Sequence, residues 1–231
     1  MRTFTSSTGH GDTETRRRPT SFSPCLRASV ACFIIVTLAA APVAAAEIER
    51  DMRIVIRTYD SAEVRTADVA AAMPTAMAIL SAAGLDVEWL ACGRGGACSA
   101  PLGANEVAVR FVRVTIPNHY RGELPLGYAL VDARTRSGAL ATIYVDRVAW
   151  LSAAARVDPR PLLGRAIAHE VGHLLLGTNG HTDAGLMRPV WSCDALRRNH
   201  SADWMFAPPD GQAMRQAVRL RAVPQIATRG D

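Results

Sequence analysis

Residues 168–189 read AHEVGHLLLGTNGHTDAGLMRP, and this stretch indicates which site the fold of the chain has to form. Within it His169 and His173 lie four residues apart, and Glu170 directly follows the first histidine. A helix turns by about 100° per residue, so both imidazoles fall on one face, about one turn apart. Between residues 166 and 177 Glu170 is the only charged side chain, and most of the others are apolar. Burial of a carboxylate and two imidazoles is costly without a partner, and a shared metal ion satisfies all three.

The third ligand of such a site has to come from beyond the helix. A hydrolytic zinc ion takes three protein ligands and keeps one position open for water. Gly177 lets the chain turn sharply at the end of the helix, and His181 follows after the short loop 178–180. We therefore expect His181 to complete the site. The pKa of a water molecule there falls to about 7, so that Glu170 accepts its proton and passes it to a leaving nitrogen.

Residues 169–189 resemble the zinc signature of the metzincin peptidases, most closely the matrixin type. Those families carry HExxHxxGxxH followed by a turn that contains methionine, often with the Met-x-Pro ending that residues 187–189 share. The resemblance implies a metzincin-like catalytic domain with a single Zn²⁺. It implies that His169, His173 and His181 are the zinc ligands and that Glu170 is the general base. Met187 would form the apolar floor beneath the metal.

The loop between the second and third histidines departs from the family pattern. His173 and His181 are eight residues apart in this chain, whereas the family has six. The loop therefore has to bulge. Because some metzincins use aspartate as the third ligand, Asp183 is the first alternative to His181, and His200 is a second.

The same resemblance implies a way to bind substrate. An antiparallel edge strand would hold an extended peptide by strand addition, and its residues are Gly127, Tyr128, Ala129 and Leu130. Trp191, which follows the methionine turn, is interpreted either as a wall of the specificity pocket or as a core residue.

These observations predict an exported zinc metalloendopeptidase that acts on a peptide or protein substrate. One alternative is a secreted zinc-binding or interaction protein on an inactive peptidase scaffold, which the longer ligand loop suggests. Another is a zinc hydrolase of a non-peptide amide. Residues 47–231 carry 21 arginines against 19 acidic residues and show no basic stripe, so nucleic-acid binding has no electrostatic support. We expect a monomer.

The N-terminal 46 residues have the three parts of a secretory signal peptide. Arginines at positions 16–18 and 27 precede an apolar run over residues 28–41, and three alanines at 44–46 offer a cleavage site. The alternative is an uncleaved membrane anchor, for which the run is short against the roughly 20 residues that a span needs. We expect the signal peptide to be removed, no membrane span to remain, and the protein to be periplasmic or extracellular.

Residues 47–231 are expected to form a single domain, since a chain of this length buries a substantial hydrophobic core without needing disulfides or metal ions for its stability. Cys92 and Cys98 flank a glycine-rich loop, and in an exported protein they are expected to form a disulfide. Cys193 is then unpaired. The alternative is that all three are buried thiols.

The hydrophobic pattern predicts five strands, three helices and the order in which they follow one another. The strands are expected at residues 53–59, 86–91, 106–114, 127–131 and 141–145, and the helices at 66–83, from 159 through the zinc motif, and at 209–221. Pro74 allows a kink or a later start of the first helix. This order predicts an α/β fold of the zincin type. One mixed, mostly parallel five-stranded sheet carries two long helices, and a methionine turn and a C-terminal helix follow.

Overall fold

The computed structural model describes residues 52–93, 98–116 and 124–222. The predicted signal peptide lies outside the described residues. Among the helices within these ranges, none has both the length and the apolar character needed to cross a bilayer.

Five strands form one sheet in the spatial order β2-β1-β3-β5-β4. Strands β2, β1, β3 and β5 run parallel to one another, and β4 lies at one edge, antiparallel to β5. The bounds of the strands are β1 Arg53–Asp60, β2 Asp86–Cys92, β3 Glu106–Val112, β4 Gly127–Asp132 and β5 Ser137–Tyr144. The expected mixed, mostly parallel five-stranded sheet is therefore confirmed, although β5 begins four residues earlier than predicted.

Alternation along the strands directs one face of the sheet toward the helices. Ile54 and Ile56 on β1, and Val107, Val109 and Phe111 on β3, are all buried. In a strand successive side chains point to opposite faces, so these residues share one face. That face holds most of the apolar core, and β-branched residues suit it because they pack well on a pleated surface.

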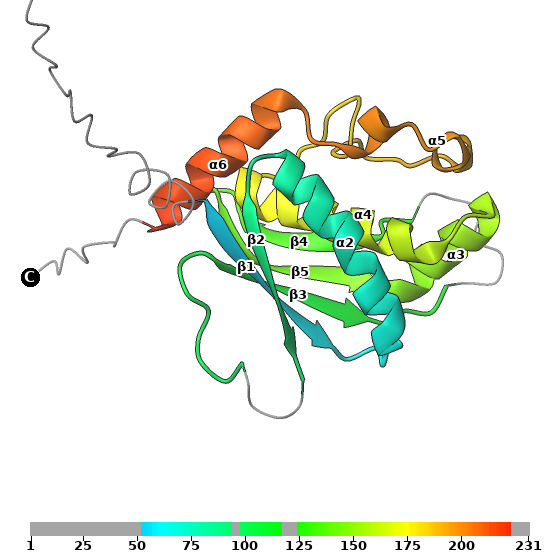
Figure 1. Ribbon diagram of the computed structural model, residues 1–231, viewed down its shortest axis with the longest axis horizontal. Helices are drawn as coiled ribbons and strands as arrows, with labels where there is room; N and C mark the ends of the chain where they lie inside the picture. The colour runs from blue at the N-terminus through cyan, green and yellow to red at the C-terminus, as the bar shows by residue number, and fades with distance from the viewer. Residues whose placement is uncertain (1–51, 94–97, 117–123, 223–231) are drawn as a thin grey trace, which may run out of the picture. The chain divides into compact units, whose positions relative to one another are not determined.

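Two long helices, α2 (Thr66–Ala82) and α4 (Pro159–Leu176), lie side by side over this face (Figure 1). Pro74 lies inside α2, which starts at Thr66 and continues past the proline to Ala82. The C-terminal helix α6 (Pro208–Ala222) is anchored by Arg221, whose Nη2 donates to the carbonyl oxygen of Leu174, 2.8 Å away, in the last turn of α4. The two long helices and the C-terminal helix thus occur as predicted.

Three further helical segments were not predicted from the sequence: α3 (Val145–Ala155), α5 (Cys193–Arg198) and the 3₁₀ turn η1 (Ser201–Trp204). In α3 the buried residues Val148, Ser152 and Ala155 recur at helical spacing. Because two of the three are a serine and an alanine, the apolar stripe is weak in the sequence, but its period of three to four residues was present.

Cys92, at the end of β2, is joined to Cys98 by a disulfide, and Cys193 is a free thiol. The bridge closes the loop that follows an edge strand. Nearby, the carbonyl oxygen of the exposed loop residue Ala100 accepts a hydrogen bond of 2.7 Å from the buried Arg57 on β1. Together the two contacts fasten the loop to the sheet.

Candidate metal centre

Helix α4 places the two histidines of the motif in the interior. It begins at Pro159, where the missing N–H costs nothing, and the Asp158 side chain caps it by accepting from Arg160 N at 2.9 Å. The middle of the helix is buried against the sheet and α2, with His169, Glu170 and His173 only 8%, 6% and 4% exposed. Three polar side chains are therefore buried within two helical turns.

The chain leaves α4 through a left-handed residue, Gly177, whose φ is 64°. Its N–H donates to the carbonyl oxygen of His173 at 3.0 Å, and the turn presents the carbonyl oxygen of Thr178 to the His173 ring. A Cβ at position 177 would lie 2.1 Å from the backbone oxygen of Arg136. Glycine is therefore required here both by the backbone conformation and by the close approach of a second segment.

Substitution of Gly177 by Ala is expected to lower the free energy of unfolding by more than about 2 kcal/mol, because left-handed strain adds to the clash with Arg136. Urea unfolding of the metal-free protein measures this. Gly177→Asn separates the two causes, since asparagine tolerates the left-handed region but still carries a Cβ. Gly93→Ala serves as the control, because nothing lies within 4 Å of a Cβ there. Equal stability of Gly177→Ala and the parent protein would contradict the prediction.

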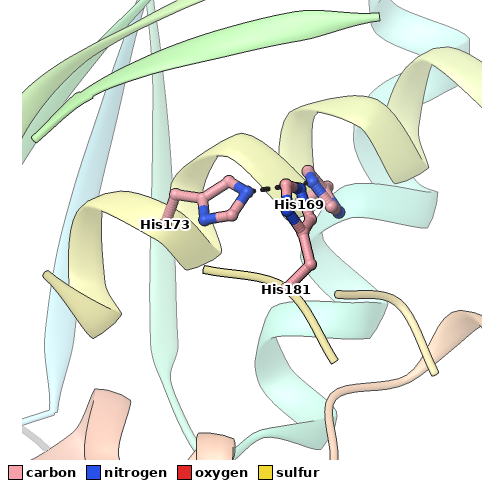
Figure 2. Close-up of side chains that lie close together, drawn as sticks. All are labelled: His169, His173 and His181. Atoms are coloured by element: carbon pink, nitrogen blue, oxygen red, sulfur yellow. Dashed lines mark hydrogen bonds between the residues drawn. The ribbon is translucent and has the colours of Figure 1, made fainter. Parts of the chain in front are cut away.

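After this turn His181 returns to α4, and three imidazoles meet (Figure 2). The ligand nitrogens of His169, His173 and His181 all lie within 4.8 Å of one another. His169 and His181 are stacked with ring centroids 5.4 Å apart, and the His173 ring stands nearly perpendicular to both. The first two histidines of the motif are buried and the third is exposed, so the cluster opens to solvent on the side of His181.

The hydrogen bonds of the two buried rings set their tautomers. Nδ1 of His169 lies 2.8 Å from the carbonyl oxygen of Leu186, and Nδ1 of His173 lies 2.8 Å from that of Thr178. A carbonyl oxygen only accepts, so each Nδ1 carries the hydrogen and each Nε2 of the neutral ring presents a lone pair. Backbone carbonyls that orient the ring in this way are typical of metal-ligating histidines.

The two Nε2 atoms face each other at a distance of 3.0 Å. Two lone pairs at that distance repel unless a cation lies between them. For zinc with bonds of about 2.0–2.1 Å, two tetrahedral nitrogen ligands are roughly 3.3 Å apart, close to the observed spacing. The residues present therefore fit a zinc ion held by His169, His173 and His181.

A proton is a poor substitute for the metal in this position. Burial lowers the pKa of His169 to about 4, and the neighbouring histidines add to the effect. Burial also lowers the pKa of His173 and of His181. At neutral pH the three rings are therefore neutral, which is the form that binds a metal.

Burial has the opposite effect on the carboxyl group of Glu170 and raises its pKa to about 8. Its carboxylate lies against Gly127, the first residue of β4. A Cβ at position 127 would be 2.6 Å from both Cγ and Oε1 of Glu170. The absence of a side chain on Gly127 therefore creates the space that the carboxylate occupies.

The alternatives for the third ligand do not join the cluster, since neither Asp183 nor His200 belongs to the metal-competent group found in the described residues. Met187 is buried, and its carbonyl oxygen accepts from Thr182 N at 3.0 Å, so the turn folds back against the end of the ligand loop. Trp191 is 9% exposed and contacts the His169 ring edge to face, with centroids 5.6 Å apart.

The histidine cluster opens into a cleft of about 610 Å³. Of the residues predicted to bind substrate, Gly127, Tyr128, Ala129 and Trp191 line it, whereas Leu130 does not. Sequence reasoning missed Trp150 and Leu151 of α3 and Arg188 of the methionine turn, which also line the cleft. Recognition of the helical period in α3 would have predicted the helix but not the face it presents.

Comparison with known proteins gives a distant match. No protein-family model matches the chain, and no curated protein matches it. Among solved structures, a zinc-dependent peptidase from Methanocorpusculum labreanum (strain Z) is similar with a TM-score of 0.43 and 15% identity, over 69% of this chain and 99% of that one. A likeness this low transfers no function, so the function has to be inferred from the site.

Proposed function

We propose that the protein is an exported zinc-dependent endopeptidase. The observation that carries the proposal is the pair of Nε2 lone pairs facing each other at 3.0 Å in a cleft, with a buried carboxylate on the adjacent residue. A structural role for two neutral imidazoles would point a donor at an acceptor. In this site each Nδ1–H donates to a backbone carbonyl oxygen. The two Nε2 atoms face each other, and neither has a hydrogen-bond donor among the described residues to accept from.

The chain's own residues supply positioning and proton transfer. Zinc held by His169, His173 and His181 would acidify a water molecule and polarise the substrate carbonyl. Glu170 accepts the proton of that water and delivers it to the nitrogen of the broken peptide bond. Burial raises the pKa of Glu170 to about 8 in the metal-free protein, and the positive charge of bound zinc would lower it again, so that the carboxylate could accept a proton.

We infer that the substrate lies along β4. This strand is at the edge of the sheet, so no strand of the described residues pairs with its outer side, which could pair with an extended peptide. Its first residue, Gly127, contacts Glu170 and lines the cleft. A peptide added at this edge would therefore run past the carboxylate and the histidine cluster.

Export is part of the proposal. It is supported by the predicted signal peptide over residues 1–46 and by the Cys92–Cys98 disulfide, a bond that persists in oxidising compartments. We propose that residues 47–231 are the mature protein with a single catalytic domain.

Metal removal tests the proposed function directly. Protein spanning residues 47–231, prepared without chelator, is expected to contain one equivalent of zinc and to cleave casein or members of a peptide library. A chelator should abolish cleavage, and added zinc should restore it. Less than about half an equivalent of zinc would refute the metal site. Full zinc occupancy without hydrolysis of any peptide would instead favour a zinc-binding protein on an inactive scaffold.

Substitution of Gly127 by Ala is expected to reduce kcat about 10- to 100-fold, because the new methyl group displaces the Glu170 carboxylate by roughly 1 Å. The fold should survive, since the atoms that must move belong to the end of a flexible side chain. Zinc content and the unfolding midpoint of the same variant are the controls. Unchanged kcat with a full complement of zinc would show that Gly127 does not position Glu170.

A further inference from the structure

Two arginines stack on one tryptophan, and one of the two lines the cleft. Arg165 belongs to α4, one turn before His169, and Arg188 follows Met187. Their Cζ atoms lie 4.0 and 4.6 Å from the centroid of the Trp204 ring. Trp204 is 2% exposed and also contacts Trp191, which in turn contacts His169. The arginines are therefore connected to the histidine cluster through two aromatic rings.

The acceptors around these two guanidinium groups are too few. Asp203 is the carboxylate that pairs with Arg188, 3.4 Å from its Nη1, and the neutral amide oxygen of Asn199 accepts from Arg165. Four buried donors lack a partner within the described chain: Nε of Arg165, Nε and Nη2 of Arg188, and Nε1 of Trp204. A guanidinium group does not lose its proton in a protein, so the cluster carries one surplus positive charge. Burial, with Arg188 as a second cause, lowers the pKa of Arg165 to about 10.

This surplus charge lies at the wall of the proposed active site, with its unpaired nitrogens below the surface. Arg188 lines the cleft together with Glu170 and the three histidines, and it is the one arginine among the described lining residues. Its side chain retains 14% exposure. Most of the remaining wall is apolar or uncharged, so a positive charge in it is poorly screened.

We propose that Arg188, supported by Arg165, recognises a carboxylate of the substrate, so that the protein prefers peptides with an acidic group on this side of the cleft. The proposal rests on the proposed function, since it concerns the substrate of the same site. A carboxylate in the cleft would neutralise the surplus charge through the exposed part of the Arg188 side chain, while the unpaired nitrogens stay below the surface. The acidic group is either the C-terminal carboxylate of a peptide or an Asp or Glu side chain.

Two pairs of peptides of equal length separate these sources. One pair differs only in a free or amidated C-terminus, and the other only in Glu or Gln at a single position, scanned along the peptide. In one of the two pairs the acidic member is expected to have a kcat/KM about 10- to 100-fold higher, the range for a hydrogen bond to a charged group. The pair that responds identifies the source of the carboxylate.

Substitutions of Arg188 and of its partner Asp203 then test the role of the arginine. The preference for the acidic peptide should fall to about threefold or less in Arg188→Gln and be intermediate in Arg188→Lys, which keeps the charge but not the fork. It should rise in Asp203→Asn, because the competing carboxylate is removed. If Arg188→Gln does not fold, the Asp203→Asn and Arg188→Lys variants decide the question. Equal rates for both members of both pairs, or a preference that the variants leave unchanged, would overturn the proposal.

A binding measurement keeps this proposal separate from the proposed function. Calorimetry with the zinc-loaded Glu170→Gln variant gives the dissociation constant of each peptide without cleavage. The acidic peptide should bind about 10- to 100-fold more tightly, and the variants at positions 188 and 203 should change this ratio as above. Preferential binding without hydrolysis by the parent protein would refute the peptidase but support the carboxylate site. Hydrolysis with equal binding of both members would refute only the carboxylate site.

Discussion

Replacement of Glu170 by Gln is expected to lower kcat for peptide hydrolysis by about three orders of magnitude while the zinc content stays at one equivalent. Glutamine has the shape of glutamate but cannot accept a proton, so only proton transfer is removed. The variant should fold at least as well as the parent, because the buried carboxylate with its pKa raised to about 8 is replaced by a neutral group.

Two further variants make this result specific. Glu170→Asp keeps the carboxylate but withdraws it by one methylene group, so an intermediate loss of kcat is expected. Glu88→Gln changes an exposed glutamate on β2, far along the sheet from α4, and should leave kcat unchanged. A Glu170→Gln enzyme with the activity of the parent would exclude Glu170 as the general base, whatever the metal content.

The second large effect is a loss of zinc affinity, which we expect when one of the three histidine ligands is replaced. Substitution of His169, His173 or His181 by Ala should weaken zinc binding by more than about 100-fold, since groups that merely orient ligands contribute 10- to 100-fold. Asp183→Ala should leave the affinity within about twofold, because Asp183 is outside the histidine group. Competition with a chromophoric chelator measures the dissociation constants.

Thermal stability provides an independent measurement of the same effect. A ligand at 1,000 times its dissociation constant stabilises the fold by about 4 kcal/mol, so the zinc-dependent gain in the unfolding midpoint should largely vanish in the three histidine variants. It should persist in Asp183→Ala. The reverse result, with His181→Ala retaining zinc and Asp183→Ala losing it, would move the third ligand from His181 to Asp183.

The local parts of the fold could be predicted from the sequence because their signals are local. The β-branched strands, the helix start at Asp158-Pro159 and the turn at Gly177 each depend on residues a few positions apart. Helix α3 could not be predicted with the same ease, because its buried face consists of Val148, Ser152 and Ala155, and two of these three are small. It packs against α4 and α5, and these contacts between separate segments are not visible in the sequence.

For the site, the sequence by itself determined the helix face with His169, Glu170 and His173, since a spacing of four residues has only one geometric outcome on a helix. The tertiary structure decided everything that depends on segments distant along the chain. It brought His181 rather than Asp183 to the other imidazoles, turned the carbonyls of Leu186 and Thr178 toward the Nδ1 atoms, and set Gly127 against Glu170. It also stacked Arg165 and Arg188 on Trp204. The physical reason is that side-chain packing across the sheet and between turns depends on distances in space, which residue spacing along the chain does not determine.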